Sequence, residues 1–285
     1  VINKEIIKPK FQRKKKWDIT PKKDNNPNER SYIEFLYKNK NSVHAITFAD
    51  VPIKHSDGLT INCKSNIDGN NRINAIVHFM EKPFDIFSDY LNDLFKLLDT
   101  TDMDDIVDKF KEIFKSISYH DFIKIHRPDR FFKEKGGKVL YNYFDNDDGN
   151  NDLDNEIEKI QEKLKTNGED EFDSTVEISV NIFEWYSTSE LTKLFEDINK
   201  FDSKLTVIEL LACTLHDVNN FTINDNVLKA ELKNSIKKYY EKKSIGETLK
   251  CFTFNSEIDK INAYDFIVGL QNLYSEKFDF IHPID

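Results

Sequence analysis

The residues with the clearest chemical potential form the run Ile-Asp-Gly-Asn-Asn-Arg from Ile67 to Arg72, between a β pattern and a helical pattern. A glycine at such a turn permits a positive φ that other residues resist. The amides that follow point outward at a helix N-terminus, where the helix dipole favours an anion. Arg72 adds a planar fork of donors that suits phosphate oxygens. The run therefore predicts a phosphate-binding turn.

Asp68 has three uses that are compatible with its place in this run. Its carboxylate can hold Arg72, bind a divalent cation that bridges phosphates, or orient a water molecule. The same residues are also consistent with a tight turn closed by an ordinary Asp–Arg ion pair, because short motifs recur by chance. The pattern alone leaves these alternatives open.

A second candidate lies near the N-terminus, where Gln12 and Arg13 precede Trp17. Gln12 and Arg13 offer donors to a phosphate or a base, and Trp17 offers a surface for stacking or packing. The intervening Lys14, Lys15 and Lys16 are typical of an exposed basic arm, which is the plainer interpretation of the segment. Such an arm is also a candidate DNA contact.

The sequence gives little indication of a second metal site. The seven histidines are scattered, and the dipeptide His216-Asp217 has no matching pair at metal-ligand spacing. Asp145 to Gly149 resembles the start of a calcium loop, with Glu156 at the twelfth position, but its glycine comes one residue early. A polar loop is the simpler interpretation. The P-loop, nucleophile-elbow and HExxH signatures are absent from the sequence.

Composition limits the class of protein. The 285 residues correspond to one large domain or two closely associated ones, and 39% apolar residues with 23 Phe suffice for a core. A net charge of −10 argues against a surface coated for non-specific DNA binding. Three dispersed cysteines predict reduced thiols in an intracellular compartment, either the cytoplasm or a viral or host compartment. The sequence lacks an apolar run long enough for a membrane span and a secretory leader, and because it starts at Val1 we expect it to continue upstream.

The elements expected to position these residues follow from hydrophobic periodicity. Helices are predicted over 29–39, 72–82, 84–98, 103–117 and 153–164, and strands over 45–51 and 59–67. Polar loops are predicted over 145–153 and 167–173, followed by a half-buried strand over 176–182. Ser187 with Glu190, and Thr206 with Glu209, stand at capping-box spacing. Residues 227–274 are predicted to be mostly helical, with Tyr239-Tyr240 and Tyr264-Asp265-Phe266 in the core.

Taken in order, these motifs resemble the GmrS-type domain of the GmrSD modification-dependent restriction systems, whose N-terminal part is similar to the ParB/sulfiredoxin fold. That family opens with Pro-x-Phe/Tyr-Gln-Arg and a following Trp, matched here by Pro9 to Arg13 and Trp17. Its signature Asp-Gly-Gln-Gln-Arg-Leu-Thr-Ala is matched by Asp68 to Ala75. The later family motifs are matched by Val176 to Ile182, Leu194 to Asn199 and Leu205 to Leu210, so that the resemblance spans about residues 5–215.

The resemblance implies an α+β fold with a small mixed sheet near the N-terminus and a mainly helical remainder. It implies a ParB-like region over 1–82, a helical part over 83–215 whose returning strand completes the same domain, and a helical extension over 216–285. The implied activity is binding and hydrolysis of a nucleoside triphosphate with a divalent cation, Mg²⁺, coupled to a nuclease domain or subunit. Asp68 and Arg72 would be catalytic, and Asp68 would be the metal ligand. The nucleotide-binding residues would be Gln12, Arg13, Gly69, Asn70, Asn71 and Asn199, and Glu209 would face the same site.

Two departures from the family pattern shape the alternatives. Asn70 and Asn71 replace the two glutamines of the signature, which keeps the amide but shortens its reach by one methylene. The C-terminal part also lacks a His-Asn-His nuclease pattern. The second hypothesis is therefore an inactive ParB-like module that binds DNA or a protein partner, and the third and weakest is DNA cleavage by this domain itself.

Overall fold

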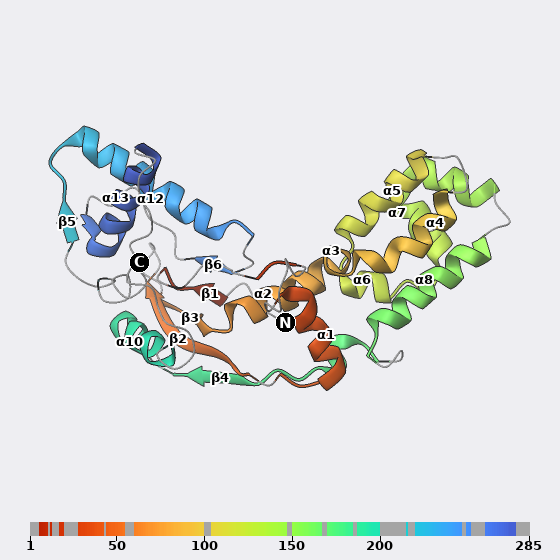
Figure 1. The fold of residues 1–285 in the computed structure, drawn as a ribbon, viewed down its shortest axis with the longest axis horizontal. Helices are drawn as coiled ribbons and strands as arrows, with labels where there is room; N and C mark the ends of the chain where they lie inside the picture. The colour runs from red at the N-terminus through yellow and green to blue at the C-terminus, as the bar shows by residue number, and fades with distance from the viewer. Residues whose placement is uncertain are drawn as a thin grey trace. The chain divides into compact units, whose positions relative to one another are not determined.

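The structure, a computed structural model, describes residues 6–10, 12, 17–19, 28–42, 44–54, 60–99, 104–146, 150–166, 170–184, 187–199, 215, 220–246, 249–251 and 260–277. The chain divides into two compact units (Figure 1). Unit 1 comprises Val1–Lys16, Ala45–Asn70 and Val180–Asp285, and unit 2 comprises Trp17–His44 and Asn71–Ser179. Each unit is therefore built from segments that are far apart in the sequence, and each has its own hydrophobic core.

Unit 1 is organised around a five-stranded mixed sheet. Its strands are β1 (Ile6–Lys8), β2 (Ile46–Lys54), β3 (Thr60–Asp68), β4 (Val180–Phe183) and β6 (Lys250–Cys251), in the order β4-β2-β3-β1-β6. The neighbours β2 and β3 are antiparallel, whereas β4 on β2, β1 on β3 and β6 on β1 are parallel. The predicted α+β class with a small mixed sheet is confirmed. The likeness to the ParB/sulfiredoxin fold stays a prediction.

The helices of unit 1 pack on this sheet through one core. Those described are α10 (Thr188–Asn199), α12 (Asn226–Ser244) and α13 (Ala263–Lys277), accompanied by a small antiparallel pair, β5 (Asn220–Thr222) and β7 (Lys260–Asn262). Buried side chains of the sheet and the three helices form this core: Ala49, Val51, Ile67, Leu191, Phe195, Leu232, Ile236, Tyr240, Ile261, Tyr264 and Val268. The predicted tyrosine anchors Tyr240 and Tyr264 are thus confirmed as core residues.

The capping box predicted before α10 is present. The Ser187 amide donates to Glu190 Oε2 at 2.9 Å, and the Glu190 amide donates to Ser187 Oγ at 3.4 Å. These bonds satisfy donors that the first helical turn leaves without an intrahelical acceptor. The second predicted box, Thr206 with Glu209, lies outside the described residues.

The strand predicted over 176–182 is shorter and less buried than expected. Only β4 pairs with β2, while Val176 and Ile178 pack against the core of unit 2. Val180 and Ile182 are about half exposed, at 47% and 50%. Alternation along a sequence reports the two-residue period of a strand, but it does not report which core covers each face. Here the first half of the segment packs against a core, whereas the apolar residues of its second half lie half exposed on an edge strand.

Unit 2 is helical (Figure 1). Its core is rich in aromatic side chains. Its helices are α1 (Glu29–Asn39), α2 (Asn70–Glu81), α3 (Pro83–Ile86), η1 (Ser88–Leu91), α4 (Asn92–Asp99), α5 (Asp104–Ser116), α6 (Tyr119–Ile123), α7 (Pro128–Asn146), α8 (Asn150–Leu164) and α9 (Phe172–Thr175). Phe79, Tyr119 and Phe172 illustrate the packing, since the Phe79 ring centroid lies 5.1 Å from Tyr119 and 5.0 Å from Phe172. Such pairs add about 0.5–1.5 kcal/mol each beyond the area they bury.

Several boundaries in unit 2 differ from the prediction. The helix predicted over 84–98 is three shorter elements, α3, η1 and α4. The polar loop predicted over 145–153 is too long, because α7 continues to Asn146 and α8 begins at Asn150. The segment that resembles the start of a calcium loop falls on this connection, and residues 147–149 lie outside the described part. The loop predicted over 167–173 ends earlier, because α9 begins at Phe172.

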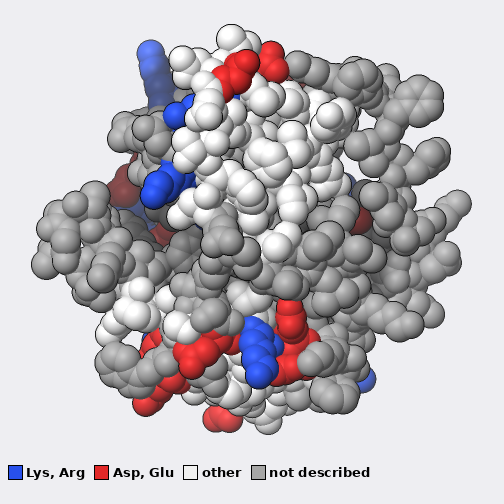
Figure 2. Space-filling view, turned by 90° about the vertical axis from the view of Figure 1, so that its left-hand side faces the viewer, with Lys and Arg blue, Asp and Glu red and all other residues white. Residues whose placement is uncertain are grey.

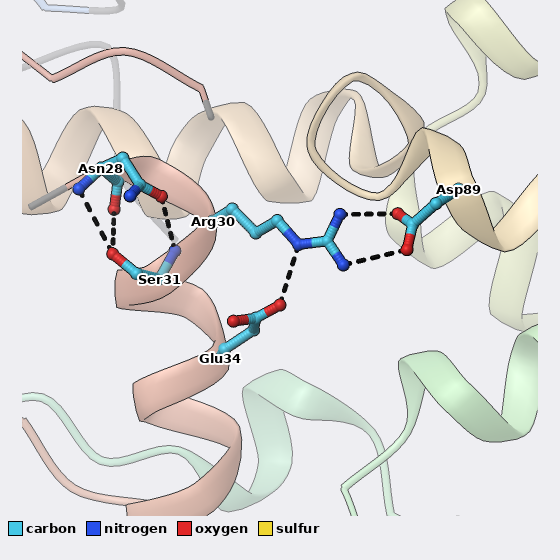
Figure 3. Close-up of polar contacts among 5 residues, drawn as sticks. All are labelled: Asn28, Arg30, Ser31, Glu34 and Asp89. Carbon is cyan, nitrogen blue, oxygen red and sulfur yellow. Dashed lines mark hydrogen bonds and ion pairs between the residues drawn. The ribbon is translucent and has the colours of Figure 1, made fainter. Parts of the chain in front are cut away.

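Helix α1 has the predicted bounds, and its N-terminus is fixed by polar contacts (Figure 3). The Ser31 amide donates to Asn28 Oδ1 at 2.8 Å, and the Asn28 amide donates to Ser31 Oγ at 3.3 Å. Arg30 then connects α1 to η1, since its two terminal nitrogens donate to both carboxylate oxygens of Asp89 at 2.6 and 3.0 Å. Arg30 Nε also donates to Glu34. A partly exposed ion pair contributes measurably to the free energy of folding when its geometry is bidentate, as it is here.

We expect Asp89→Asn to lower the free energy of unfolding by about 0.2–1 kcal/mol at pH 7, the range for partly exposed ion pairs. The Arg30 guanidinium lowers the pKa of Asp89. A carboxylate with a lowered pKa stabilises the fold above its ordinary pKa of about 3.9, and this contribution is lost as the pH falls through the folded-state value. Urea unfolding of both proteins at pH 7 and near pH 3 should show a difference that shrinks on acidification. Glu158→Gln, which neutralises an exposed carboxylate on α8, is the control, and a pH-independent difference for Asp89→Asn contradicts the assignment.

Candidate functional site

The predicted phosphate-binding turn is a sharp junction between β3 and α2. The pairing of β2 with β3 shifts register at this end, because Thr47 lies opposite Asp68 and Phe48 lies opposite Asn66. Ile67 is the extra residue of a β-bulge, a feature that bends a strand and redirects the residues after it. Gly69 follows with φ 89°, and the helix begins at the next residue. The predicted strand-to-helix turn is therefore present.

Gly69 is required by both conformation and space. A Cβ at this position would lie 3.1 Å from Ile46 Cγ1 and 3.2 Å from Ile46 Cγ2, closer than most side-chain contacts allow. The positive φ adds a cost that residues with a side chain rarely accept. Ile46 is itself buried at the start of β2. The turn can therefore lie this close to the sheet because residue 69 has no side chain.

The first turn of α2 has the electrostatic character of an anion site. It contains no acidic residue, and glycine as the preceding residue has no side chain to cap it. Asn70 is buried, while Asn71 and Arg72 are half-buried. Burial raises the pKa of Tyr32 of α1, and the positive charge of Arg72 opposes part of that rise. Arg72, which carries the guanidinium, thus belongs to the same first turn as the partial positive charge of the helix N-terminus.

The structure brings Gln12 to this turn, although the two are more than fifty positions apart in the sequence. The chain turns after β1, where the Gln12 amide donates to the Pro9 carbonyl at 3.1 Å. Gln12 Nε2 then donates to Asn66 Oδ1 at 2.8 Å and to the Ile67 carbonyl at 3.0 Å. Asn66 Nδ2 in turn donates to the Asp68 carbonyl at 3.1 Å. Gln12 and Asn66 are 4% and 0% exposed, so this network is part of the interior.

The direction of these hydrogen bonds is fixed by the backbone. A carbonyl oxygen can only accept, so the Ile67 and Asp68 carbonyls must face the nitrogens of Gln12 and Asn66. Both amide orientations are therefore determined, and Gln12 presents Oε1 as a buried acceptor. Among the described residues no donor hydrogen-bonds this atom. A buried acceptor without a donor costs about 1–3 kcal/mol, and native proteins seldom leave such atoms uncompensated.

The C-terminal helices of unit 1 hold the segment that carries Gln12. The carbonyl of Lys10 accepts from Lys243 Nζ and, at 3.2 Å, from Tyr264 Oη. Lys10 Nζ forms an ion pair with Asp265 at 3.2 Å, and the same carboxylate accepts from Tyr240 Oη at 2.6 Å. Burial raises the pKa of Tyr240, so its hydroxyl remains a donor at neutral pH. Residues of α12 and α13 therefore fix the position of Lys10, two residues before Gln12.

The other predicted site residues are not brought to the turn by any described contact. Arg13, Lys14, Lys15 and Lys16 lie outside the described residues, as does Glu209, and the side chain of Asn199, the last residue of α10, is not described. Trp17 packs against Tyr32, with ring centroids 5.4 Å apart at 60°, and joins the core of unit 2. The structure thus gives Trp17 a packing role.

Sequence reasoning missed the residues that position Gln12. Asn66, Asp265 and Lys243 belong to no motif, and their partners lie tens to hundreds of residues away in the chain. The only local indication was Tyr264-Asp265-Phe266 as a core segment. A polar residue at the centre of an apolar helix face suggests a buried partner, but it does not identify that partner.

Comparison of the chain with protein-family models, with characterised proteins and with solved structures found no match. Within the described part of the chain, no helix is both long and apolar enough to cross a membrane. The face drawn in Figure 2 shows described acidic side chains lying beside the basic ones, without a continuous basic area among the described residues. The predicted site roles and the family resemblance therefore stay predictions.

Replacing Gly69 with alanine tests the constraint on the turn. We expect Gly69→Ala to lower the free energy of unfolding by about 2–3 kcal/mol, because a strained backbone and a close contact with Ile46 act together. Gly246→Ala is the matched control, since Gly246 has φ 73° but no atom within 4 Å of an added Cβ, and about 1–2 kcal/mol is expected there. Urea denaturation of the three proteins measures the difference. Equal losses would show that the contact with Ile46 has no consequence.

Proposed function

We propose that this protein binds a nucleoside triphosphate at the turn from Asp68 to Arg72 and hydrolyses it, as a domain of the GmrS type. One observation carries the proposal: a glycine-initiated helix N-terminus lies beside the buried Gln12, whose Oε1 has no donor among the described residues. The helix end and Arg72 attract an anion. The amide oxygen requires a donor. A nucleotide supplies both kinds of group in one molecule.

The buried Gln12 Oε1, which has no donor among the described residues, favours a nucleotide over an inorganic phosphate. Phosphate oxygens are mainly acceptors at neutral pH, so they complement the helix N-terminus and the guanidinium but not an amide oxygen. A ribose hydroxyl, a base amino group or a water bound to a cation can donate to Gln12 Oε1. Gln12 Nε2 already donates to Asn66 Oδ1 and to the Ile67 carbonyl. In this proposal, Oε1 is therefore the atom of Gln12 that accepts a hydrogen bond from the ligand.

Energetics indicate that the turn needs further cations. A micromolar site requires about 8 kcal/mol of binding free energy. The helix N-terminus contributes about 0.3–1 kcal/mol, and each hydrogen bond to a charged group about 1.5–3 kcal/mol. Arg72 and the first-turn amides together therefore fall short of, or barely reach, that value once ordering costs are included. Arg13, next to Gln12 in the sequence, is the natural additional contributor in this proposal.

In this proposal, Asp68 binds Mg²⁺ and is a catalytic residue. Mg²⁺ commonly binds through one or two carboxylates together with phosphate oxygens and waters, and a half-buried carboxylate at the end of a strand fits that role. The ion would neutralise charge on the phosphates. Arg72 would stabilise the charge that develops on the transferred group. Asn70 and Asn71 would bind the phosphates through shorter side chains than the family's glutamines.

The alternative proposal is a ParB-like module that has kept binding but lost turnover. It rests on the two asparagines of the signature and on the run Lys14 to Lys16, which would contact DNA or a protein partner. Its affinity for DNA would fall steeply with salt, because each lysine that neutralises a phosphate releases a counterion. Nucleotide binding without phosphate release, together with salt-sensitive DNA binding, would favour this alternative over hydrolysis.

Removing the guanidinium tests the phosphate assignment. We expect Arg72→Ala to weaken ATP or GTP binding at least about tenfold and to abolish Mg²⁺-dependent phosphate release, because one or two charge-assisted hydrogen bonds of about 1.5–3 kcal/mol are lost. Calorimetry and a phosphate-release assay measure the two effects. Arg127→Ala, which removes an exposed arginine of unit 2, is the control. Unchanged binding and turnover in Arg72→Ala, relative to wild type, would reject the site.

Replacing Gln12 separates ligand recognition from loss of stability. Gln12→Leu removes the acceptor and the two donors, so we expect nucleotide affinity to fall about tenfold and stability to fall by about 1–3 kcal/mol. Gln161→Leu is the matched control, because Gln161 is also a buried glutamine whose Nε2 donates to backbone carbonyls, at 2.8 Å to Phe122 and 3.0 Å to Ile125. Calorimetry and urea unfolding should show that both variants are destabilised and that only Gln12→Leu loses affinity. Equal affinities would exclude Gln12 from the binding site.

A further inference from the structure

A second cluster of ligand-type side chains lies within unit 2. His120, Glu171 and Asp173 each direct one potential ligand atom into a common region, and these atoms all lie within 4.8 Å of one another. His120 belongs to α6, and the two carboxylates flank the start of α9, some fifty positions later in the sequence. Three features distinguish this set from an ordinary group of surface acids: a rigid scaffold, an oriented imidazole and a characteristic spacing.

The scaffold is a buried contact between the residues next to the ligands. Tyr119 precedes His120, and Phe172 separates Glu171 from Asp173. Tyr119 Oη accepts a hydrogen bond from the Phe172 amide at 2.7 Å, and both aromatic side chains are buried, at 0% and 2% exposure. The inward residues thus join the two segments by contacts that involve no ion. Their neighbours His120, Glu171 and Asp173 are presented together on the outside.

The imidazole has only one ring nitrogen available. His120 Nδ1 is sealed from solvent, and none of the described residues hydrogen-bonds it. Nε2 faces Asp173 Oδ2 at 3.5 Å. This separation exceeds the usual hydrogen-bond range of about 2.7–3.2 Å. It matches the separation of about 3.4 Å between two ligands of a tetrahedral ion with bonds of about 2.0–2.1 Å.

We propose that His120, Glu171 and Asp173 bind a divalent transition-metal ion of the zinc class. Imidazole nitrogen suits zinc and its neighbours, whereas Mg²⁺ and Ca²⁺ prefer ligands that are all oxygen. Two carboxylates neutralise the charge of the ion. Three protein ligands leave at least one coordination position for water, as in zinc sites that bind or activate a small molecule. The bound ion connects α6 to the segment that opens α9, so it also stabilises unit 2.

Zinc binding to the full-length chain, stripped of metal with a chelator, tests the proposal. We expect one Zn²⁺ per chain by calorimetry, with His120→Ala and Asp173→Ala each weakening binding at least about tenfold, since loss of even an outer-shell partner costs 10–100-fold. Millimolar Mg²⁺ should not displace the ion. At zinc concentrations of about 100 times the Kd, the folding equilibrium constant of the wild type should rise about 100-fold, and that of His120→Ala should not.

The controls are close matches. His126→Ala removes an exposed histidine of the same unit, and Asp170→Asn neutralises an exposed acid next to Glu171; both should bind zinc as the wild type does. Circular dichroism and metal-free urea unfolding verify that each variant is folded. Absence of zinc binding in the wild type overturns the proposal. Undiminished binding in His120→Ala also overturns it, because the ion would then be held elsewhere, for example by a cysteine thiol.

Discussion

At Gly69 the backbone passes with φ 89° so close to Ile46 that an added Cβ would lie only 3.1 Å from its side chain, which would have to shift. This close approach determines where β3 ends and α2 begins. With the bulge at Ile67 just before it, the helix starts directly at the end of the sheet, and its N-terminal amides lie next to the last residues of β3. A longer loop would separate the positive end of the helix from the sheet. The glycine therefore sets the geometry on which a phosphate site at this turn depends.

The hydrogen-bond network around Gln12 fixes the orientation of the side-chain amides beside this turn. Backbone carbonyls of Ile67 and Asp68 dictate how the amides of Gln12 and Asn66 are turned, so the acceptor of Gln12 has a fixed place beside the turn. A buried network is worth more when every member is satisfied, and it is costly where one is not. Among the described residues, Gln12 Oε1 is such a member. A ligand that donated to this atom would recover that free energy only while residues of α12 and α13 hold Lys10 and the segment that carries Gln12.

Local chemistry explains which features the sequence could predict. The helix of α1, the capping box at Ser187 and the turn at Gly69 depend on residues within a few positions of each other, and each appears where the sequence places it. The pairing of β1 with β3 and β6 could not be foreseen, because parallel strands are joined by long connections and their partners carry no mutual signal. For β4, by contrast, the sequence predicted the strand from its alternating pattern. It could not predict how deeply the strand is buried, because burial depends on the elements that pack against it.

Ligand chemistry explains how one acidic chain can discriminate between ions. With a net charge of −10, its average field attracts cations of every kind and repels nucleotides. Selection must therefore come from short-range contacts. In the proposed nucleotide site, amides, a guanidinium and a single carboxylate would bind an anion together with an oxygen-bound Mg²⁺. At His120, a nitrogen 3.5 Å from one carboxylate oxygen and within 4.8 Å of a second would favour a transition ion in the proposed site. The two sets differ in the atoms they offer, and that difference would let Mg²⁺ and Zn²⁺ occupy separate places on the same protein.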